Sequence, residues 1–140
     1  MGKRSTGRKL AMQLLYQSDI RGGQDPGVFA TSFWELHGFQ DPIQEWAMGL
    51  ASATWQVREQ VDGLIAQFAI GWSIQRIQPV DKAVLRLAFY ELLHTDTDPK
   101  IIINEAVELS KRYSTTDSPR FINGILGGYL TTCSPASSAE

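Results

Sequence analysis

The sequence predicts an all-α fold, a single domain of about seven helices. Three observations support this prediction. Apolar residues recur at helical spacing along most of the chain, and no stretch alternates apolar and polar residues as a half-buried strand does. Glycines, or an aspartate followed by proline, separate the helical stretches. A length of 140 residues suffices for one sizeable core but not for two ordinary domains.

The first half of the chain is expected to form three helices. An amphipathic pattern predicts the first over residues 5–21, and the glycines at 22–23 end it. The Asp-Pro pair at 25–26 supplies an N-cap and a first helical residue for a short second helix that closes at Gly38. A further Asp-Pro pair begins an apolar pattern over residues 41–68, where we expect one continuous helix.

The second half is expected to form a short turn and then three helices. Residues 79–94 are apolar nearly all round the helix axis, which places this helix at the centre of the domain. Residues 98–113 carry apolar side chains on one face and charges on the other. Asp117 or Ser118 then caps a last helix, in which proline occupies the first turn.

The helical domain is expected to span residues 1–130, with the small polar residues 131–140 as a disordered tail.

Composition excludes several classes of protein and site. No stretch is apolar for the length of a membrane span, and residues 1–9 are too polar for a secretory leader, so we expect a cytoplasmic protein. Cys133 is the single cysteine, which precludes an internal disulfide and a zinc cluster. No phosphate-binding glycine loop is present, so no cofactor is expected.

Charge is uneven along the chain although the net charge is only -2. Four basic residues precede the first acid, Asp19, whereas acids outnumber bases over residues 24–80. Arg4 and Arg8 share one helix face, and Tyr16 lies two turns further along as a candidate stacking surface for an unpaired base. This combination suits single-stranded RNA. Basic N-termini are also common solvated tails, so both interpretations stay open on this ground.

Candidate catalytic groups are few. His37 and His94 each stand at the end of a predicted helix, where a cation complements the helix dipole, and structural roles are favoured for both. Glu91 is the odd charge in the apolar arc of the central helix. A buried carboxylate needs a cationic or hydrogen-bonding partner, so we favour a structural ion pair over a perturbed catalytic acid.

Several motifs, in order and correctly spaced, resemble those of the NusB family. The longest runs from Pro79-Val80-Asp81-Lys82 to Glu91-Leu92-Leu93 and is followed by the Ile-Asn-Glu-Ala-Val-Glu-Leu-Ser-Lys stretch at 103–111. The segment 117–126 resembles the family's C-terminal motif, and Leu14-Leu15-Tyr16 resembles its first helix. The resemblance covers the chain from about Arg4 to Leu130.

The resemblance implies a non-enzymatic transcription antitermination factor with two packed helical subdomains. Such a protein binds the boxA RNA of ribosomal RNA leaders together with NusE, a ribosomal protein, and reaches other Nus factors and RNA polymerase indirectly. The residues implied to approach RNA are Arg4, Arg8, Tyr16, Asp117 and Arg120. The residues implied to contact NusE are Asp81 and Phe121.

For several of these residues a structural role is as plausible on physical grounds as the implied contact with RNA or NusE. Asp117 can serve as an N-cap, Phe121 can belong to the core, and Asp81 complements the helix dipole in a first turn. The residues 5–7 are Ser-Thr-Gly, where some family members carry a dense arginine run. Fewer phosphate contacts imply weaker RNA binding alone and a greater dependence on NusE.

Two other functions were weighed. A similar helical domain occurs fused to RNA cytosine methyltransferases, but the chain to Glu140 has no room for that catalytic fold, and Cys133 lies in the predicted tail. A protein-interaction module, including a homodimer that covers Arg4, Arg8 and Tyr16, stays open on sequence grounds.

Overall fold

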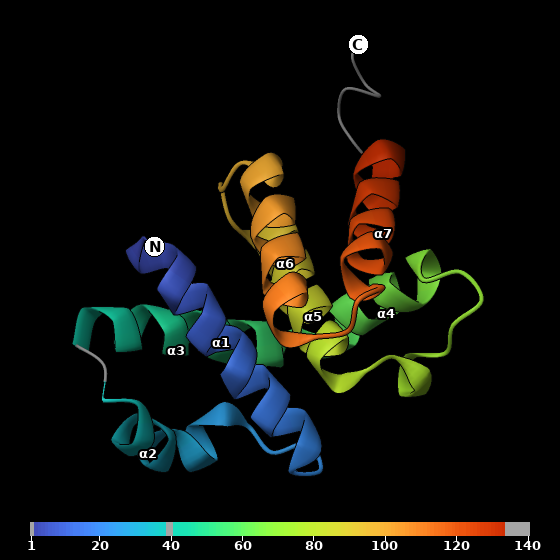
Figure 1. The fold of residues 1–140 in the computed structure, drawn as a ribbon. Coiled ribbons are helices and arrows are strands. Elements are labelled where there is room, and N and C mark those ends of the chain that lie inside the picture. Colours follow the sequence, from blue (N-terminus) through green and yellow to red (C-terminus); the bar gives the residue numbers. More distant parts are fainter. Residues whose placement is uncertain (1, 39–40, 134–140) are drawn as a thin grey trace.

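The computed structural model describes residues 2–38 and 41–133, and over these residues the chain is almost entirely helical. Within them it forms seven α-helices and one short 3₁₀ helix and no strand, as the sequence predicts (Figure 1). In chain order the elements are α1 (Lys3–Ile20), α2 (Pro26–His37), α3 (Asp41–Gln56), α4 (Arg58–Phe68), η1 (Ile74–Arg76), α5 (Pro79–His94), α6 (Pro99–Tyr113) and α7 (Ser118–Cys133).

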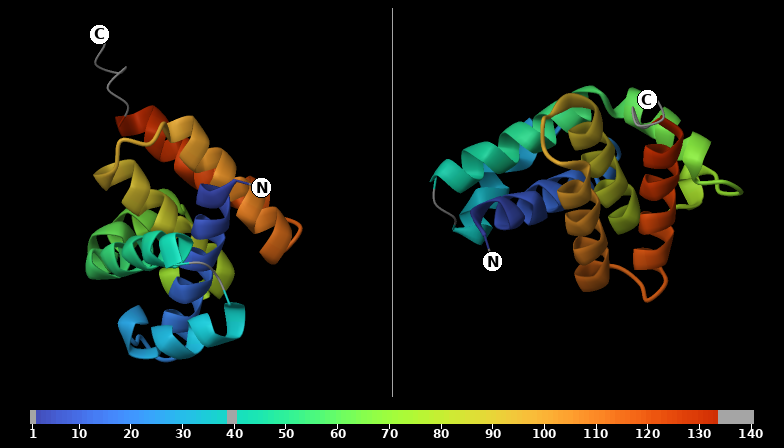
Figure 2. Two further views of the ribbon diagram at one scale, coloured as in Figure 1. Left: turned by 90° about the vertical axis from the view of Figure 1, so that its left-hand side faces the viewer. Right: turned by 90° about the horizontal axis from the view of Figure 1, so that it is seen from above.

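The helices form two groups that meet at α5. In the N-terminal group α1 packs along α3, and α2 contacts both; in the C-terminal group α6 packs along α7, and α4 lies against α5 and α7 (Figures 1 and 2). The central helix α5 contacts α1, α3, α4, α6 and α7. Its position confirms the prediction from its all-round apolar sequence.

The core is continuous through both groups. From α1 it receives Leu10, Leu14 and Leu15, and from α5 it receives Leu85 and Phe89, all fully buried. The buried apolar side chains of α1 recur every three or four residues, as an amphipathic helix requires. Burial of this face fixes α1 against α5, and thereby fixes where the basic end of α1 lies.

Two predicted helix starts are confirmed by their caps. The Asp25 carboxylate accepts a hydrogen bond from Gly27 N at 2.8 Å, and the Asp98 carboxylate accepts one from Lys100 N at 2.9 Å. In both cases proline follows as the first helical residue, so the chain turns sharply into α2 and α6.

The single long helix predicted over residues 41–68 is wrong, because the chain leaves helical geometry at Val57 (φ -107°, ψ 23°). Thr54 Oγ1 donates to the carbonyl of Leu50 at 2.7 Å, a bond that bends helices. Arg58 Nη1 donates to the carbonyl of Trp55 at 2.8 Å and so satisfies a group that a continuous helix would bond internally. The apolar pattern runs on because α3 and α4 both face the core.

The predicted boundary of the tail is also wrong by a few residues. Residues 131–133 continue α7 instead of leaving the helix, and the rest of the predicted tail, residues 134–140, lies outside the described residues. In the described ranges, no helix is both long and apolar enough to cross a membrane.

Candidate functional site

The first two turns of α1 pack against the indole ring of Trp46 on α3. The guanidinium carbon of Arg4 lies 5.3 Å from the centroid of this ring, and that of Arg8 lies 5.4 Å from it. Gly7 stands between them, and a Cβ atom at this position would overlap Cε3 and Cζ3 of Trp46. Gly7 therefore permits the close approach of α1 to α3, a role that the sequence analysis did not assign to it.

Arg8 is anchored inside the protein by Glu91 of α5. Arg8 Nε lies 2.8 Å from Glu91 Oε2 and Nη2 lies 2.9 Å from Oε1, and the two residues are 4% and 2% exposed. Burial by itself lowers the pKa of Arg8, but the hydrogen bond and the charge of Glu91, with the charge of Glu105, raise it above its ordinary value. Arg8 therefore stays cationic, and the structural ion pair predicted for Glu91 is confirmed.

This burial conflicts with a direct RNA contact by Arg8. Two of its nitrogens face Glu91, and the third, Nη1, lies 3.8 Å from Glu105 Oε1 on α6. Ser5 Oγ donates to the other oxygen of Glu105 at 2.9 Å, so the same acid also holds the first turn of α1. In this arrangement Arg8 ties α1 to α5 and α6, while the exposed Arg4 remains in contact with solvent.

Tyr16 is half-buried and packs against the core, about 18 Å further along α1 than Arg4. The two residues therefore do not share a pocket. They mark two positions along one helix, at which an extended ligand would be contacted separately.

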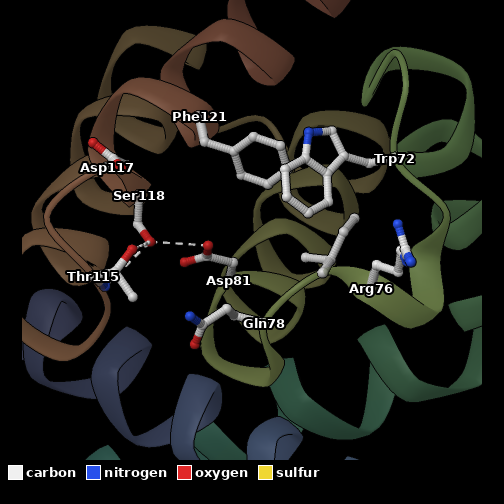
Figure 3. A pocket seen from close by; sticks show the side chains of 9 residues that line it. Trp72, Arg76, Gln78, Asp81, Thr115, Asp117, Ser118 and Phe121 are labelled. Carbon is white, nitrogen blue, oxygen red and sulfur yellow. Dashed lines mark hydrogen bonds between the residues drawn. The ribbon is translucent and has the colours of Figure 1, made fainter.

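A second cluster surrounds the junction of α6 and α7. Asp81 of α5 is only 5% exposed, and its Oδ1 atom accepts a hydrogen bond from Ser114 Oγ at 2.6 Å. Its Oδ2 atom accepts one from Ser118 Oγ at 2.9 Å (Figure 3). Thr115 N donates to Ser118 Oγ at 3.2 Å. Both carboxylate oxygens of Asp81 are thus used to hold the junction, and this side chain fixes where α7 begins.

A pocket of about 230 Å³ opens beside this junction. Asp81 and Phe121 line it from α5 and α7, and Trp72 closes the opposite side from the loop after α4 (Figure 3). The rings of Trp72 and Phe121 meet edge to face, with centroids 5.5 Å apart. Phe121 is half-buried, so it is neither a core residue alone nor a freely exposed one.

The apolar surface extends beyond the pocket. Ile70 is 88% exposed and Trp72 is 50% exposed, and both line a second hollow together with Phe121 and Arg120. Arg120 itself is exposed. Aromatic and aliphatic side chains gathered in this way, next to an arginine, are typical of a protein-binding surface.

Asp117 is exposed at the edge of the same pocket. Its backbone carbonyl accepts a hydrogen bond from Phe121 N at 3.2 Å, as expected of the residue that precedes α7. Its carboxylate points away from Asp81 in the close view, and the two acids therefore have different surroundings (Figure 3).

The predicted site residues thus fall into three places. The structure brings together Asp81, Asp117, Arg120 and Phe121 at the start of α7, and it brings together Arg4 and Arg8 at the start of α1, while Tyr16 stands apart. Sequence reasoning missed Trp46 and Trp72. The signal for Trp72 was available in the sequence, since it follows Gly71 in the stretch between two predicted helices, where a tryptophan belongs to no predicted helix face.

The two histidines are the other candidates for chemistry that the sequence offers. His94 Nε2 lies 3.0 Å from Gln60 Oε1, a contact between helix surfaces, and the side chain of His37 lies outside the described residues. In the part of the chain that the structure describes, no three histidine, cysteine or acidic side chains are placed to hold a metal ion.

Comparison with known proteins places this geometry in a family. The sequence model of the NusB family matches residues 5–131. The transcription antitermination protein NusB of Syntrophotalea carbinolica is 39% identical, over 96% of this chain and 96% of that protein. The protein of the same name from Symbiobacterium thermophilum is 39% identical, over 98% of this chain and 95% of its own length.

Solved structures agree with the sequence relatives. The T. maritima NusB structure has a TM-score of 0.85 at 28% identity and covers 99% of this chain and 97% of that one. A crystal structure of the antitermination factors NusB and NusE in complex with double-stranded RNA contains a chain with a TM-score of 0.83 at 27% identity, covering 94% of this chain and 98% of that one. With a family match over nearly its whole length, this chain belongs to the NusB family.

Proposed function

We propose that this protein is a non-enzymatic transcription antitermination factor that binds boxA-type single-stranded RNA of ribosomal RNA leaders together with the ribosomal protein NusE. One observation carries the proposal: its fold matches, over 94% of the chain, a chain in a solved assembly of NusB and NusE with double-stranded RNA. The curated relatives described above are named for antitermination and not for catalysis. Other Nus factors and RNA polymerase would be engaged indirectly.

The RNA surface that we propose uses two exposed arginines, one at the start of α1 and one at the start of α7. Arg4 offers a planar cation at the start of α1, and Arg120 offers another at the start of α7. Phosphate contacts of this kind supply most of the affinity and make it fall as salt rises. Tyr16, half-buried on α1, offers the exposed part of its ring, and Asp117 lies close enough in sequence to affect bases near Arg120. Arg8 acts indirectly, because its ion pair with Glu91 sets the position of the first turns of α1.

The NusE surface that we propose is the apolar area formed by Ile70, Trp72 and Phe121. Exposed aromatic residues at the rim of a pocket are the anchors that dominate binding energy in protein interfaces. Asp81 contributes here mainly by holding the α6–α7 junction, since its two carboxylate oxygens already accept hydrogen bonds from Ser114 and Ser118. Trp72→Ala is therefore expected to weaken NusE binding more than Asp81→Asn does.

A titration followed by fluorescence anisotropy tests the proposal. The full-length protein is added to labelled boxA-type RNA, with and without NusE, at two salt concentrations. We expect tighter binding with NusE, a loss of affinity at the higher salt, and a further loss with Arg120→Ala. Lys100→Ala is the matched control, because Lys100 is an exposed cation in the first turn of α6, at the opposite end of that helix from the α6–α7 junction.

Two results would overturn the proposal in different ways. If RNA does not bind although a NusE complex forms, the protein is an interaction module only. If neither binds, and sedimentation shows a homodimer, self-association is the function that this surface serves. If Arg120→Ala and Lys100→Ala lower RNA affinity equally, the assignment of Arg120 to the RNA surface is contradicted, although the protein still binds RNA.

A further inference from the structure

A cleft of about 370 Å³ lies between the start of α1, the middle of α3 and the loop that joins α5 to α6. Arg4 and Trp46 line it from the two helices, and Leu50 adds an apolar surface. The loop contributes Asp96 and Thr97. This volume is within the range of small-molecule sites and exceeds what a single planar ring needs.

The wall of this cleft is held in place before any ligand arrives. Trp46 is fixed by its contact with Gly7, where a larger residue would collide with the ring. Glu91, which also lines the cleft, is occupied by Arg8 and offers no free negative charge. Arg4, by contrast, forms no ion pair with any residue that the structure describes, and its guanidinium rests over the indole ring.

The chemistry of the cleft suits a nucleobase better than a phosphate. A guanidinium plane and an indole ring stack on the faces of bases. The exposed carboxylate of Asp96 would repel a phosphate but can accept hydrogen bonds from an amino group on a base edge. Adenine, cytosine and guanine carry such an amino group, and uracil does not.

We infer that this cleft is a subsite for one unpaired, amino-bearing base of the bound RNA, stacked on the Arg4–Trp46 wall and hydrogen-bonded to Asp96. The inference rests on the proposed RNA-binding function and adds a base-reading position to it. The subsite lies about 18 Å from Tyr16 along α1, so it reads a different nucleotide. The glycine of the Ser-Thr-Gly sequence at 5–7 is required in this arrangement, because Gly7 makes room for Trp46, which forms the wall.

The test combines protein variants with an abasic scan of the RNA. Each nucleotide of the boxA-type oligomer is replaced in turn by an abasic one, and affinity is measured by anisotropy with full-length protein and NusE. Arg4→Lys keeps the charge but removes the stacking plane, and Asp96→Asn removes the carboxylate. Glu45→Gln, an exposed acid on α3 outside the cleft, controls for the gain in affinity that loss of any negative charge produces.

We expect Arg4→Lys to weaken binding about tenfold, the effect of losing one base stack. Asp96→Asn should bind more weakly than Glu45→Gln. Both cleft variants should lose their effect at one and the same abasic position. Uridine at that position should remove the effect of Asp96→Asn, because uracil has no amino group, but keep the effect of Arg4→Lys, because uracil still stacks. Thermal unfolding midpoints equal to wild type would show that the exposed substitutions leave the fold intact.

The outcomes separate the two levels of the account. If RNA binds with NusE but the cleft variants match Glu45→Gln at every abasic position, the subsite is overturned and the proposed function stands. If the wild-type protein with NusE binds no RNA, the proposed function fails and the subsite fails with it. An effect of Arg4→Lys that is the same at all abasic positions would make Arg4 a phosphate contact and also overturn the subsite.

Discussion

The start of α1 and the start of α7 are each anchored by a buried charged residue, but the anchoring interactions differ in chemistry. In each, one buried charged residue holds the backbone and an exposed arginine of the same region is left for a ligand. Arg8 is buried and Arg4 exposed at the start of α1, while Asp81 is buried under the α6–α7 junction and Arg120 is exposed in the first turn of α7. The anchor at α1 is an ion pair between two buried charges, Arg8 and Glu91. The anchor at α7 is a carboxylate that accepts hydrogen bonds from neutral hydroxyl groups.

This difference determines how each region responds when its anchor is broken. Removal of one partner of a buried ion pair leaves an uncompensated charge, whereas loss of a charge–hydroxyl contact leaves groups that can bond elsewhere or reach water. A charged residue therefore cannot be assigned to ligand binding from its type and helix face alone. Its burial and its partner decide.

The largest effect is expected from Arg8→Ala. It should lower the free energy of unfolding by about 3–5 kcal/mol, because Glu91 is left buried without a partner. Urea denaturation of the variant and of Arg4→Ala measures this, and Arg4→Ala, at an exposed position, should change stability by less than about 0.5 kcal/mol. Equal stabilities of the two variants would contradict the anchoring role.

A smaller loss is expected when Asp81→Asn weakens the α7 anchor. The contacts with Ser114 and Ser118 are hydrogen bonds to a charged group, so their weakening should cost about 1–2 kcal/mol. Hydrogen exchange at the amides of Ser118 and Phe121, which donate to the carbonyls of Thr115 and Asp117, should become faster, while amides in α1 stay protected. Uniform loosening of both regions would show that the junction is not a local anchor.

Two glycines of opposite surroundings should give effects of opposite sign, the smaller of them at Gly63. Gly7→Ala places a methyl group against the Trp46 ring and should destabilise by about 1–2 kcal/mol, an overpacking penalty partly offset by better helix propensity. Gly63→Ala on α4 meets nothing within 4 Å and should stabilise by about 0.5–1 kcal/mol. The sign of the difference, measured by thermal unfolding, tests the close approach of α1 to α3.

Much of the fold could be predicted from the sequence because its signals are local. The caps at Asp25 and Asp98 and the apolar pattern of α5 depend on neighbours within a turn or two. The break at Val57 could not be predicted, since the apolar pattern continues through it and only side-chain bonds to carbonyls reveal it.

The site was harder to predict because its anchors join distant segments. An ion pair was expected for Glu91, but its partner, Arg8, lies 83 residues away in sequence. Arg4 and Arg8 share a helix face, so spacing alone treats them alike, although one is exposed and the other buried. Trp46 was missed because an apolar residue in a helix is by default assigned to the core.

The central claim is that Arg4 contacts RNA whereas Arg8 only positions the start of α1, and one comparison of variants tests it most directly. The double variant Arg8→Met with Glu91→Leu replaces the buried pair by apolar side chains, a change that buried pairs often tolerate. In anisotropy with NusE and boxA-type RNA, we expect the folded double variant to bind within about twofold of wild type, and Arg4→Ala to bind several-fold more weakly. A folded double variant that has lost RNA binding, beside an Arg4→Ala variant that has kept it, would contradict the account.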